Sequence, residues 1–399
     1  MRTCLTSLRH RPGFVVACFL YPLFAAPLLI VGPARAQQGF PDWAAAGDGS
    51  LASTAQKPVD PTQSAPRWTF SAEALVLGRT GGANQSLVGL LPGGMTWLAT
   101  QTAAASAVES FNANQFWQGF SAGPKVSVTY HDESGFGVEF SYFNIFTQSA
   151  AKTVGPTGPS NTADWLVMYA PGTFWQTQDF PYQGMAWKDA TNLYNAEADG
   201  RLDLSPRVTL LGGLRWLQLN DELQGTLTPL DRGEPTWKYD DLSLSQVQNP
   251  PLSTPTVTNP PFWTTRTVNN LYGVQIGVDG KLWELGRLSL DGQIKAGVFD
   301  NNAEQTTVVS MAKQLYAAQA TTNAAAFVGE AALQAKYQLA KGLAFKLGYE
   351  ALWLDGVALA PGQIRETYTT TPPSVRALGV NSGSNVLFQG VTAGLEASF

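Results

Sequence analysis

The end of the chain constrains its fold more than any other stretch. In residues 386–399 (VLFQGVTAGLEASF), one alternating set of side chains is apolar except for Gln389. The other set is small or polar beyond Phe388. A period of two is typical of a β-strand with one apolar and one polar face. If this strand belongs to a sheet with one apolar side, the rest of the chain must supply more strands of the same kind.

The first 36 residues have the three parts of a secretory signal peptide. Three arginines precede an apolar run over residues 14–31, and Ala34-Arg35-Ala36 follows it. Ala34 and Ala36 form an A-x-A signal peptidase site, so we expect cleavage after Ala36. A membrane anchor is the alternative, but two prolines interrupt the apolar run.

The composition of the remaining chain excludes several functions. Both cysteines, Cys4 and Cys18, lie in the signal segment, which excludes disulfides and thiolate chemistry from the mature protein. Without the four arginines of that segment, 21 basic and 30 acidic residues leave a net charge of −9. An acidic chain without a basic run is not expected to bind nucleic acid.

The same composition favours strands that face lipid. Charged residues make up only 14% of the chain, against about a quarter in typical soluble domains. No mature segment reaches the roughly 18 consecutive apolar residues that a membrane helix needs. A chain with few charges and no long apolar run fits strands that expose only alternate residues to lipid.

Residues 37–66 are rich in Ala, Gly, Ser, Gln and Pro and show no periodicity, which predicts a flexible periplasmic leader. Strand-like alternation follows in ten segments: 68–79, 119–130, 136–147, 191–204, 207–220, 268–282, 287–299, 326–339, 343–354 and 386–399. The connections after the second, fourth, sixth and eighth segments are tight. Those after the odd-numbered segments run from roughly 25 to 45 residues.

Short turns alternating with long loops are typical of a membrane barrel, in which they face the periplasm and the exterior respectively. We therefore predict an all-β fold over residues 67–399. It is a closed, antiparallel, up-and-down transmembrane β-barrel of about 10 strands, or 12 if a loop carries one more hairpin. The alternative is a soluble β-sandwich or lipocalin-like barrel with the apolar face inside. Recurring charged faces and aromatic residues near strand ends favour the membrane barrel.

The last 80 residues resemble a known family. The stretches 327–337 (FVGEAALQAKY), 347–361 (LGYEALWLDGVALAP) and 387–399 are similar to the outer-membrane β-barrel (porin-like) family described from planctomycete bacteria. The resemblance implies an outer-membrane barrel but no defined substrate and no catalytic residues. The terminal Phe399 also resembles the last residue of other bacterial outer-membrane barrels. This likeness implies that Phe399 is an assembly signal, read by the barrel assembly machinery.

The sequence contains few candidate catalytic residues. His131 is the one histidine outside the signal segment, and it lies in a predicted tight turn. Without a placed histidine or cysteine, the usual catalytic bases and metal ligands are missing, so we expect no enzyme, no metal and no cofactor. Carboxylates in the loops, Asp231 with Glu234 or Asp240 with Asp241, could still hold calcium, although exposed acids are usually only solvated.

The polar faces of the strands predict charges that line the lumen. These are Lys125, Glu139, Glu197, Asp199, Arg201, Asp203, Arg215, Asp291, Lys295, Glu330, Lys336, Lys346, Glu350 and Glu396. A turn at Ser205-Pro206 pairs Asp203 with Thr209, and therefore Glu197 with Arg215 and Asp199 with Gly213.

A turn near Lys341 likewise sets Lys336 opposite Lys346, an unfavourable pair of like charges unless acids such as Glu350 and Glu396 interleave. The lumen-lining charges either fill a narrow interior as a salt-bridged plug or line an aqueous path and set its ion preference.

Two functions fit this sequence. The first is an integral outer-membrane barrel that acts as a small or gated porin-like channel for solutes or ions. The second is a plugged structural or adhesive barrel whose long loops bind partners or surface polymers. Residues 81–117 contain an alanine-rich middle that predicts a short helix, which could fold into the lumen as a constriction. Outer-membrane lipid and the assembly machinery are the partners expected in both cases.

Overall fold

A computed structural model describes residues 68–80, 82–91, 108–155, 165–168, 184–228, 262–311, 314–370 and 374–399. The chain divides into two compact units, residues 1–60 and 61–399. The first unit, and with it the predicted signal peptide and most of the predicted leader, lies outside the described residues. In the described part of the chain, no helix is long and apolar enough to cross a membrane.

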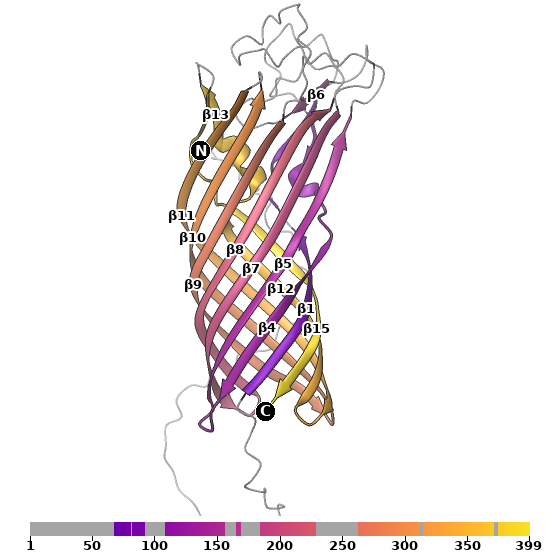
Figure 1. Cartoon of the computed structure of the whole chain (residues 1–399), viewed down its shortest axis with the longest axis vertical. Helices are drawn as coiled ribbons and strands as arrows, with labels where there is room; N and C mark the ends of the chain where they lie inside the picture. Colours follow the sequence, from indigo (N-terminus) through magenta and orange to yellow (C-terminus); the bar gives the residue numbers. More distant parts are fainter. Residues whose placement is uncertain are drawn as a thin grey trace, which may run out of the picture. The chain divides into compact units, whose positions relative to one another are not determined.

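The second unit is built on a closed barrel of ten antiparallel strands, which confirms the predicted fold class (Figure 1). Around the barrel these strands are β1 (Trp68–Thr80), β15 (Ser384–Ser398), β12 (Leu343–Val357), β11 (Gln314–Ala340), β10 (Leu288–Met311), β9 (Phe262–Leu285), β8 (Val208–Thr228), β7 (Gly184–Ser205), β5 (Phe136–Val154) and β4 (Phe120–His131). The first and last strands close the barrel, in a register that runs from Thr69 opposite Ser398 to Thr80 opposite Leu387.

Smaller elements lie in the connections. β2 (Ser86–Leu91), β3 (Val108–Asn112) and β6 (Trp165–Met168) form a three-stranded sheet, and β13 (Thr367–Thr370) pairs with β14 (Ser374–Ala377). Two short 3-10 helices are η4 (Ala113–Gln115) and η5 (Ala360–Glu366). None of these elements joins the barrel, so among the described residues the strand number is ten rather than twelve.

One end of the barrel, called here the turn end, carries four tight turns and the terminal Phe399. Gly135 and Gly286 have positive φ angles of 82° and 60°, which only glycine adopts at no steric cost. In the β4–β5 turn, the Asp132 carboxylate accepts hydrogen bonds from the side chain and backbone of Ser134 and from the backbone N–H of Phe136. The side-chain bond from Ser134 is the main cause that lowers the pKa of Asp132.

At the opposite loop end, the strands extend further than the sequence suggested. β10 continues to Met311 and β11 begins at Gln314. The long connection expected over residues 300–325 is therefore wrong, because both flanking strands run through it and leave only residues 312–313 between them. The strand signal was weak here because the outward side chains are mostly polar or small, so they do not form an apolar face.

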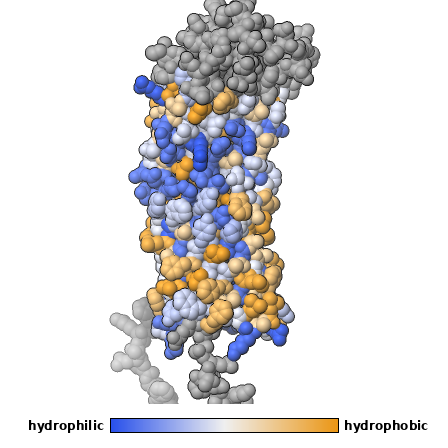
Figure 2. All heavy atoms as spheres, in the orientation of Figure 1, coloured by the Kyte–Doolittle hydropathy of each residue, from blue (hydrophilic) through white to orange (hydrophobic). Residues whose placement is uncertain are grey.

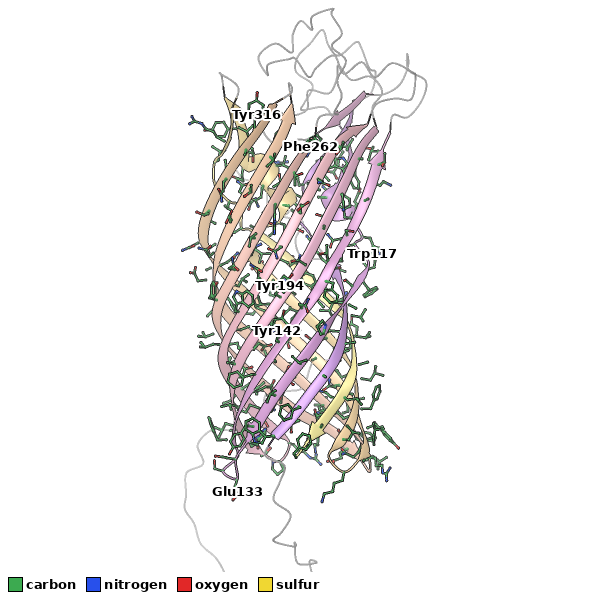
Figure 3. All side chains as sticks on the ribbon, viewed as in Figure 1. Trp117, Glu133, Tyr142, Tyr194, Phe262 and Tyr316 are labelled. Carbon is green, nitrogen blue, oxygen red and sulfur yellow. The ribbon has the colours of Figure 1, made fainter. Side chains whose placement is uncertain are left out.

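Near the turn end, the outer wall carries a belt of exposed apolar side chains (Figure 2). Members of this belt are Phe140, Leu202, Leu214, Val274, Ile276, Val298, Leu333, Leu347 and Val391, all at least 42% exposed. Aromatic residues mark its upper boundary, among them Tyr142 and Tyr194 on neighbouring strands (Figure 3). On β8, β9, β10 and β11, the outward residues above that boundary, towards the loop end, are mainly polar. An apolar band bordered by aromatic rings is the exterior expected of a barrel in lipid.

The closing pair of strands generates the first prediction. A Cβ atom on Gly390 would lie 2.0 Å from the carbonyl oxygen of Val76 on β1. Gly390→Ala should therefore push β15 away from β1 and destabilise the barrel by about 1–3 kcal/mol or more. Gly379→Ala, where the added atom meets nothing within 4 Å, is the matched control.

The two variants can be compared by denaturant unfolding in lipid vesicles and by heat-modifiable gel migration. Equal stability of Gly390→Ala and Gly379→Ala would contradict the β1–β15 closure.

Candidate functional site

The candidate site is the barrel interior. Its level nearest the turn end is a layer of charged side chains. These side chains surround a cavity of about 360 Å³. Eleven of the residues predicted to line the lumen also line this cavity: Lys125, Glu139, Glu197, Arg201, Asp291, Lys295, Glu330, Lys336, Lys346, Glu350 and Glu396. Together with Asp199, Arg215, Glu73 and Asp279 they are called here the charged layer.

The remaining predicted residues lie close by. Asp199 and Arg215 are buried and contact other members of the charged layer. Asp203 lies at the β7–β8 turn, where its side chain is 39% exposed and accepts a hydrogen bond from Thr209. The predicted register of this hairpin is confirmed, with Asp203 opposite Thr209 and Glu197 opposite Arg215.

Buried ion pairs cross the interior from strand to strand. Lys295 on β10 contacts Glu197 at 2.8 Å and Asp199 at 3.0 Å, both on β7. Arg215 on β8 reaches Glu330 on β11, with 2.8 Å between Nη1 and Oε2. Its contact to Glu197, the residue directly opposite, is longer at 3.8 Å. Each cation therefore reaches an acid on a strand that is not its neighbour in the barrel, which ties distant parts of the wall together.

Two lysines of like charge lie side by side, as the sequence predicted. Lys336 on β11 and Lys346 on β12 are direct cross-strand partners. Glu396 on β15 lies between them, 3.2 Å from Lys336 and 3.5 Å from Lys346. Lys346 also contacts Glu73 at 2.7 Å, and Lys336 contacts Asp291 at 3.2 Å. The interleaved acids remove the repulsion that two adjacent ammonium groups would otherwise cause.

The charged layer also includes residues that the sequence reading did not select. Glu350, which was expected beside the two lysines, pairs with Lys125 instead, and Glu73 contacts Lys346. Arg201 bridges Glu139 and Asp279. Glu73 and Asp279 lie on the polar faces of predicted strands, so the alternation contained the signal that would have identified them.

Above the charged layer, an apolar layer fills the barrel. Its side chains come from nine of the ten barrel strands, every one except β4, and none is more than 5% exposed. They are Leu75, Leu77, Phe143, Ile145, Leu193, Leu217, Leu219, Leu271, Phe299, Val328, Leu352, Leu354, Val386 and Phe388. Packed side chains at this density leave no room for a continuous column of water.

A buried polar level follows towards the loop end. Arg79 on β1 contacts Asp221 on β8 at 2.6 Å and Asp189 on β7 at 3.8 Å. Thr191 donates a hydrogen bond to Asp221 and accepts one from Arg79. Gln118, which precedes β4, donates to Asp189 at 2.6 Å. This cluster joins the wall to the connection between β1 and β4.

A segment from the last connection enters the barrel above the apolar layer. This inserted segment comprises residues 358–370 and 374–383 and contains η5. Asn269 on β9 accepts a hydrogen bond from the Ala358 N–H at 2.6 Å and donates to its carbonyl at 2.8 Å. The Ala360 N–H donates to Asp221 at 2.8 Å. Polar side chains of the wall therefore satisfy the backbone of the inserted segment.

A second apolar core surrounds the inserted segment. It combines barrel residues Trp187, Leu223 and Trp263 with residues from β2, β3, η4, η5 and β14. Residues 81–117, between β1 and β4, were considered as a constriction of the lumen. From these residues, β2, β3 and η4 contribute to the second core. The alanine-rich middle of this connection, however, lies outside the described residues.

The residues considered from the sequence for catalysis or metal binding are a histidine and several acids. Among the described residues, no group of three or more acids, histidines or cysteines could hold a metal ion. His131 lies at the β4–β5 turn, with its Nδ1 atom 3.9 Å from Asp203. The acids considered for calcium, Asp231 to Asp241, lie outside the described residues.

The ion pairs generate the second prediction. Lys346→Met preserves side-chain length but leaves Glu73 buried without its cation. Breaking a buried pair in this way should cost about 3–5 kcal/mol of unfolding free energy. Lys281→Met at the exposed Lys281–Glu284 pair should cost about 1 kcal/mol or less.

Urea unfolding of both variants in lipid vesicles measures the difference. Similar losses of stability in the two variants would show that the charged layer is solvated rather than buried.

Comparisons with known proteins return only distant structural similarity. No family model matches the sequence, and no curated protein is similar to it. One similar solved structure is the outer membrane protease OmpT from Escherichia coli, at 9% identity and a TM-score of 0.44, covering 84% of this chain and 97% of that one. Another is the toluene transporter TodX from Pseudomonas putida, at 9% identity and a TM-score of 0.30, covering 84% of this chain and 91% of that one.

Proposed function

We propose that the protein is an integral outer-membrane β-barrel with a closed interior, whose outward end carries its function. The apolar belt, with its aromatic border, supports insertion in a bilayer. Closure of the barrel pairs the strand edges that lipid could not satisfy. In this orientation the turn end faces the periplasm and the loop end faces the exterior.

The apolar layer is the observation that carries the proposal of a closed interior. An ion that crosses this layer would have to give up its water without gaining polar partners, which is costly. Hydrophobic constrictions stop conduction for this reason. The charged cavity beneath it then serves as a vestibule open to the periplasm, and its ion pairs strengthen the wall. This is the plugged surface barrel that the sequence offered as its second function.

The terminal strand supports the expected partner in assembly. The ring of Phe399 is 74% exposed and makes an edge contact with Phe70, while its backbone N–H donates to the carbonyl of Trp68 at 2.9 Å. A residue with a fixed backbone and a largely exposed ring is suited to recognition by another protein. We propose that the barrel assembly machinery recognises this end, and that outer-membrane lipid surrounds the belt.

A gated channel is the second candidate, and the inserted segment favours it. Described hydrogen bonds hold this segment to Asn269, Asp221 and Thr267 by side chains rather than by strand pairing with the wall. Such contacts break more easily than a β-ladder. Withdrawal of the segment would loosen the second core and the top of the apolar layer, which it covers with Leu359. We propose no catalytic role for either candidate.

The third prediction concerns conductance. The refolded wild-type protein in a planar bilayer should show no single-channel steps, because the apolar layer is packed. Leu217→Ser combined with Leu271→Ser should introduce water and produce small steps or a leak. Discrete steps from the folded wild-type protein would contradict the closed interior.

The fourth prediction separates the two candidates. Asn269→Leu removes both hydrogen bonds to Ala358 without opening the wall. A closed structural barrel predicts that this variant stays silent but unfolds at lower temperature. A gated channel instead predicts brief openings, whose ion preference then shifts when Lys346→Glu is added.

A further inference from the structure

The outer wall above the belt presents a continuous row of amide side chains on four neighbouring strands. Gln218 on β8, Asn270 on β9, Asn302 on β10 and Asn323 on β11 are direct cross-strand partners. Gln218 donates to Asn270 at 3.1 Å, and Asn302 donates to Asn323 at 2.9 Å. This row is called here the amide ladder. Each amide that bonds to its neighbour keeps further donors and acceptors for a ligand.

Aromatic rings border the amide ladder on the side of the belt. Trp216 and Tyr272 are cross-strand partners and lie two residues from Gln218 and Asn270 on their strands. Residues two apart point to the same face and are separated by about 7 Å. Tyr272 is 58% exposed, so much of its side chain is accessible. Tyr194 continues the ladder on β7, directly opposite Gln218.

A groove lies on the same outer face, beyond the amide ladder. It has a volume of about 320 Å³ and is lined by Glu222, Thr264, Arg266, Val268, Glu304, Thr306 and Val308. The pairs Glu222–Arg266 and Val268–Glu304 place it across β8, β9 and β10, the strands that carry three of the four amides. The groove therefore adjoins the amide ladder on the outer wall, and it adds apolar side chains, Val268 and Val308, to the polar ones. Figure 2 shows hydrophilic side chains above the apolar belt on the barrel wall.

The polar groups of this surface fit hydroxyl groups better than phosphate. A hydroxyl can donate a hydrogen bond to the carboxylates of this surface and accept one from its guanidinium. It can do either with the amides and threonines. The groove carries two carboxylates and one guanidinium, so a phosphate would meet a net negative charge. Exposed aromatic rings beside hydrogen-bonding side chains offer an apolar face to the C–H face of a sugar ring.

We propose that the amide ladder and groove form a binding site for the neutral saccharide headgroup of an outer-leaflet glycolipid. The inference rests on the proposed placement of the barrel in the outer membrane. The ladder begins two residues above the aromatic border, at the height where lipid headgroups lie. We therefore take a lipid headgroup, rather than a free sugar, as the ligand. The acyl chains of the same lipid would then pack on the belt below.

The test uses the refolded full mature barrel in mixed micelles. The probe is digalactosyldiacylglycerol, offered together with equimolar phosphatidylcholine and phosphatidylglycerol of the same acyl chains. Native mass spectrometry counts the lipids that the protein retains. The wild type should retain the glycolipid at least tenfold over either phospholipid. Gln218→Leu combined with Asn270→Leu should abolish most of this preference, and Tyr272→Leu should reduce it severalfold.

A matched control uses an exposed amide elsewhere on the wall. Asn385→Leu changes an outward residue of β15, opposite Asp355, without touching the ladder, and should retain the wild-type preference. Because all substituted side chains face outward, heat-modifiable migration should be unchanged in every variant. Equal retention by wild type and the Gln218/Asn270 variant would overturn the proposal, as would equal retention of the three lipids.

Two further outcomes identify the origin of a failure. If free digalactosylglycerol binds as tightly as the intact glycolipid, the site does not recognise a membrane headgroup and the proposal is overturned. If the wild-type protein stays soluble without detergent, the membrane placement itself fails. That second result appears before any lipid is added, so the two failures are distinguishable.

Discussion

The pairing of β1 with β15 is the contact on which the rest of the structure depends. This ladder joins residues 69–80 to residues 387–398 and turns an open sheet into a closed wall. A strand edge exposed to lipid would leave its backbone groups without partners, at a cost of several kcal/mol for each. Closure also creates the enclosed interior in which buried charges can pair. The close approach of Gly390 to Val76 shows how little space the closing strands leave.

Along a strand, the types of the inward-facing and outward-facing residues change from the turn end to the loop end. On β8, inward residues change from Arg215 through Leu217 and Leu219 to Asp221, which are charged, apolar and polar in turn. Outward residues on the same strand change from apolar Leu214 to polar Gln218 and Asn220. The belt therefore ends near the height at which the interior becomes apolar. Charged residues therefore lie inside where apolar residues face outward, and the apolar interior layer begins near the height at which the outer wall of β8 becomes polar.

Much of this arrangement could be predicted from the sequence. The ten strands and the register of Glu197 with Arg215 and Lys336 with Lys346 follow from alternation and turn length. The extension of β10 and β11 over residues 300–325 could not be found in the same way. There, outward Asn302 and inward Asn301 are the same residue type, so the contrast between faces disappears.

The apolar layer was also beyond the sequence. Leu217 and Leu219 lie on the same strand face as Arg215, and only the three-dimensional stacking of strands collects such residues into one layer. The inserted segment depends on tertiary hydrogen bonds from Asn269 and Asp221, which no local pattern indicates. Long-range contacts of this kind leave no periodic signal.

Thiol labelling from each side of a vesicle tests the central claim, a transmembrane barrel closed by its apolar layer. Glu133→Cys at the turn end, Asn323→Cys on the outer wall and Ser127→Cys in the charged cavity would each be the only thiol in the mature protein. The account predicts that a membrane-impermeant maleimide reaches Ser127→Cys only from the side on which Glu133→Cys reacts. Labelling of Ser127→Cys at the same rate from the side of Asn323→Cys would contradict it.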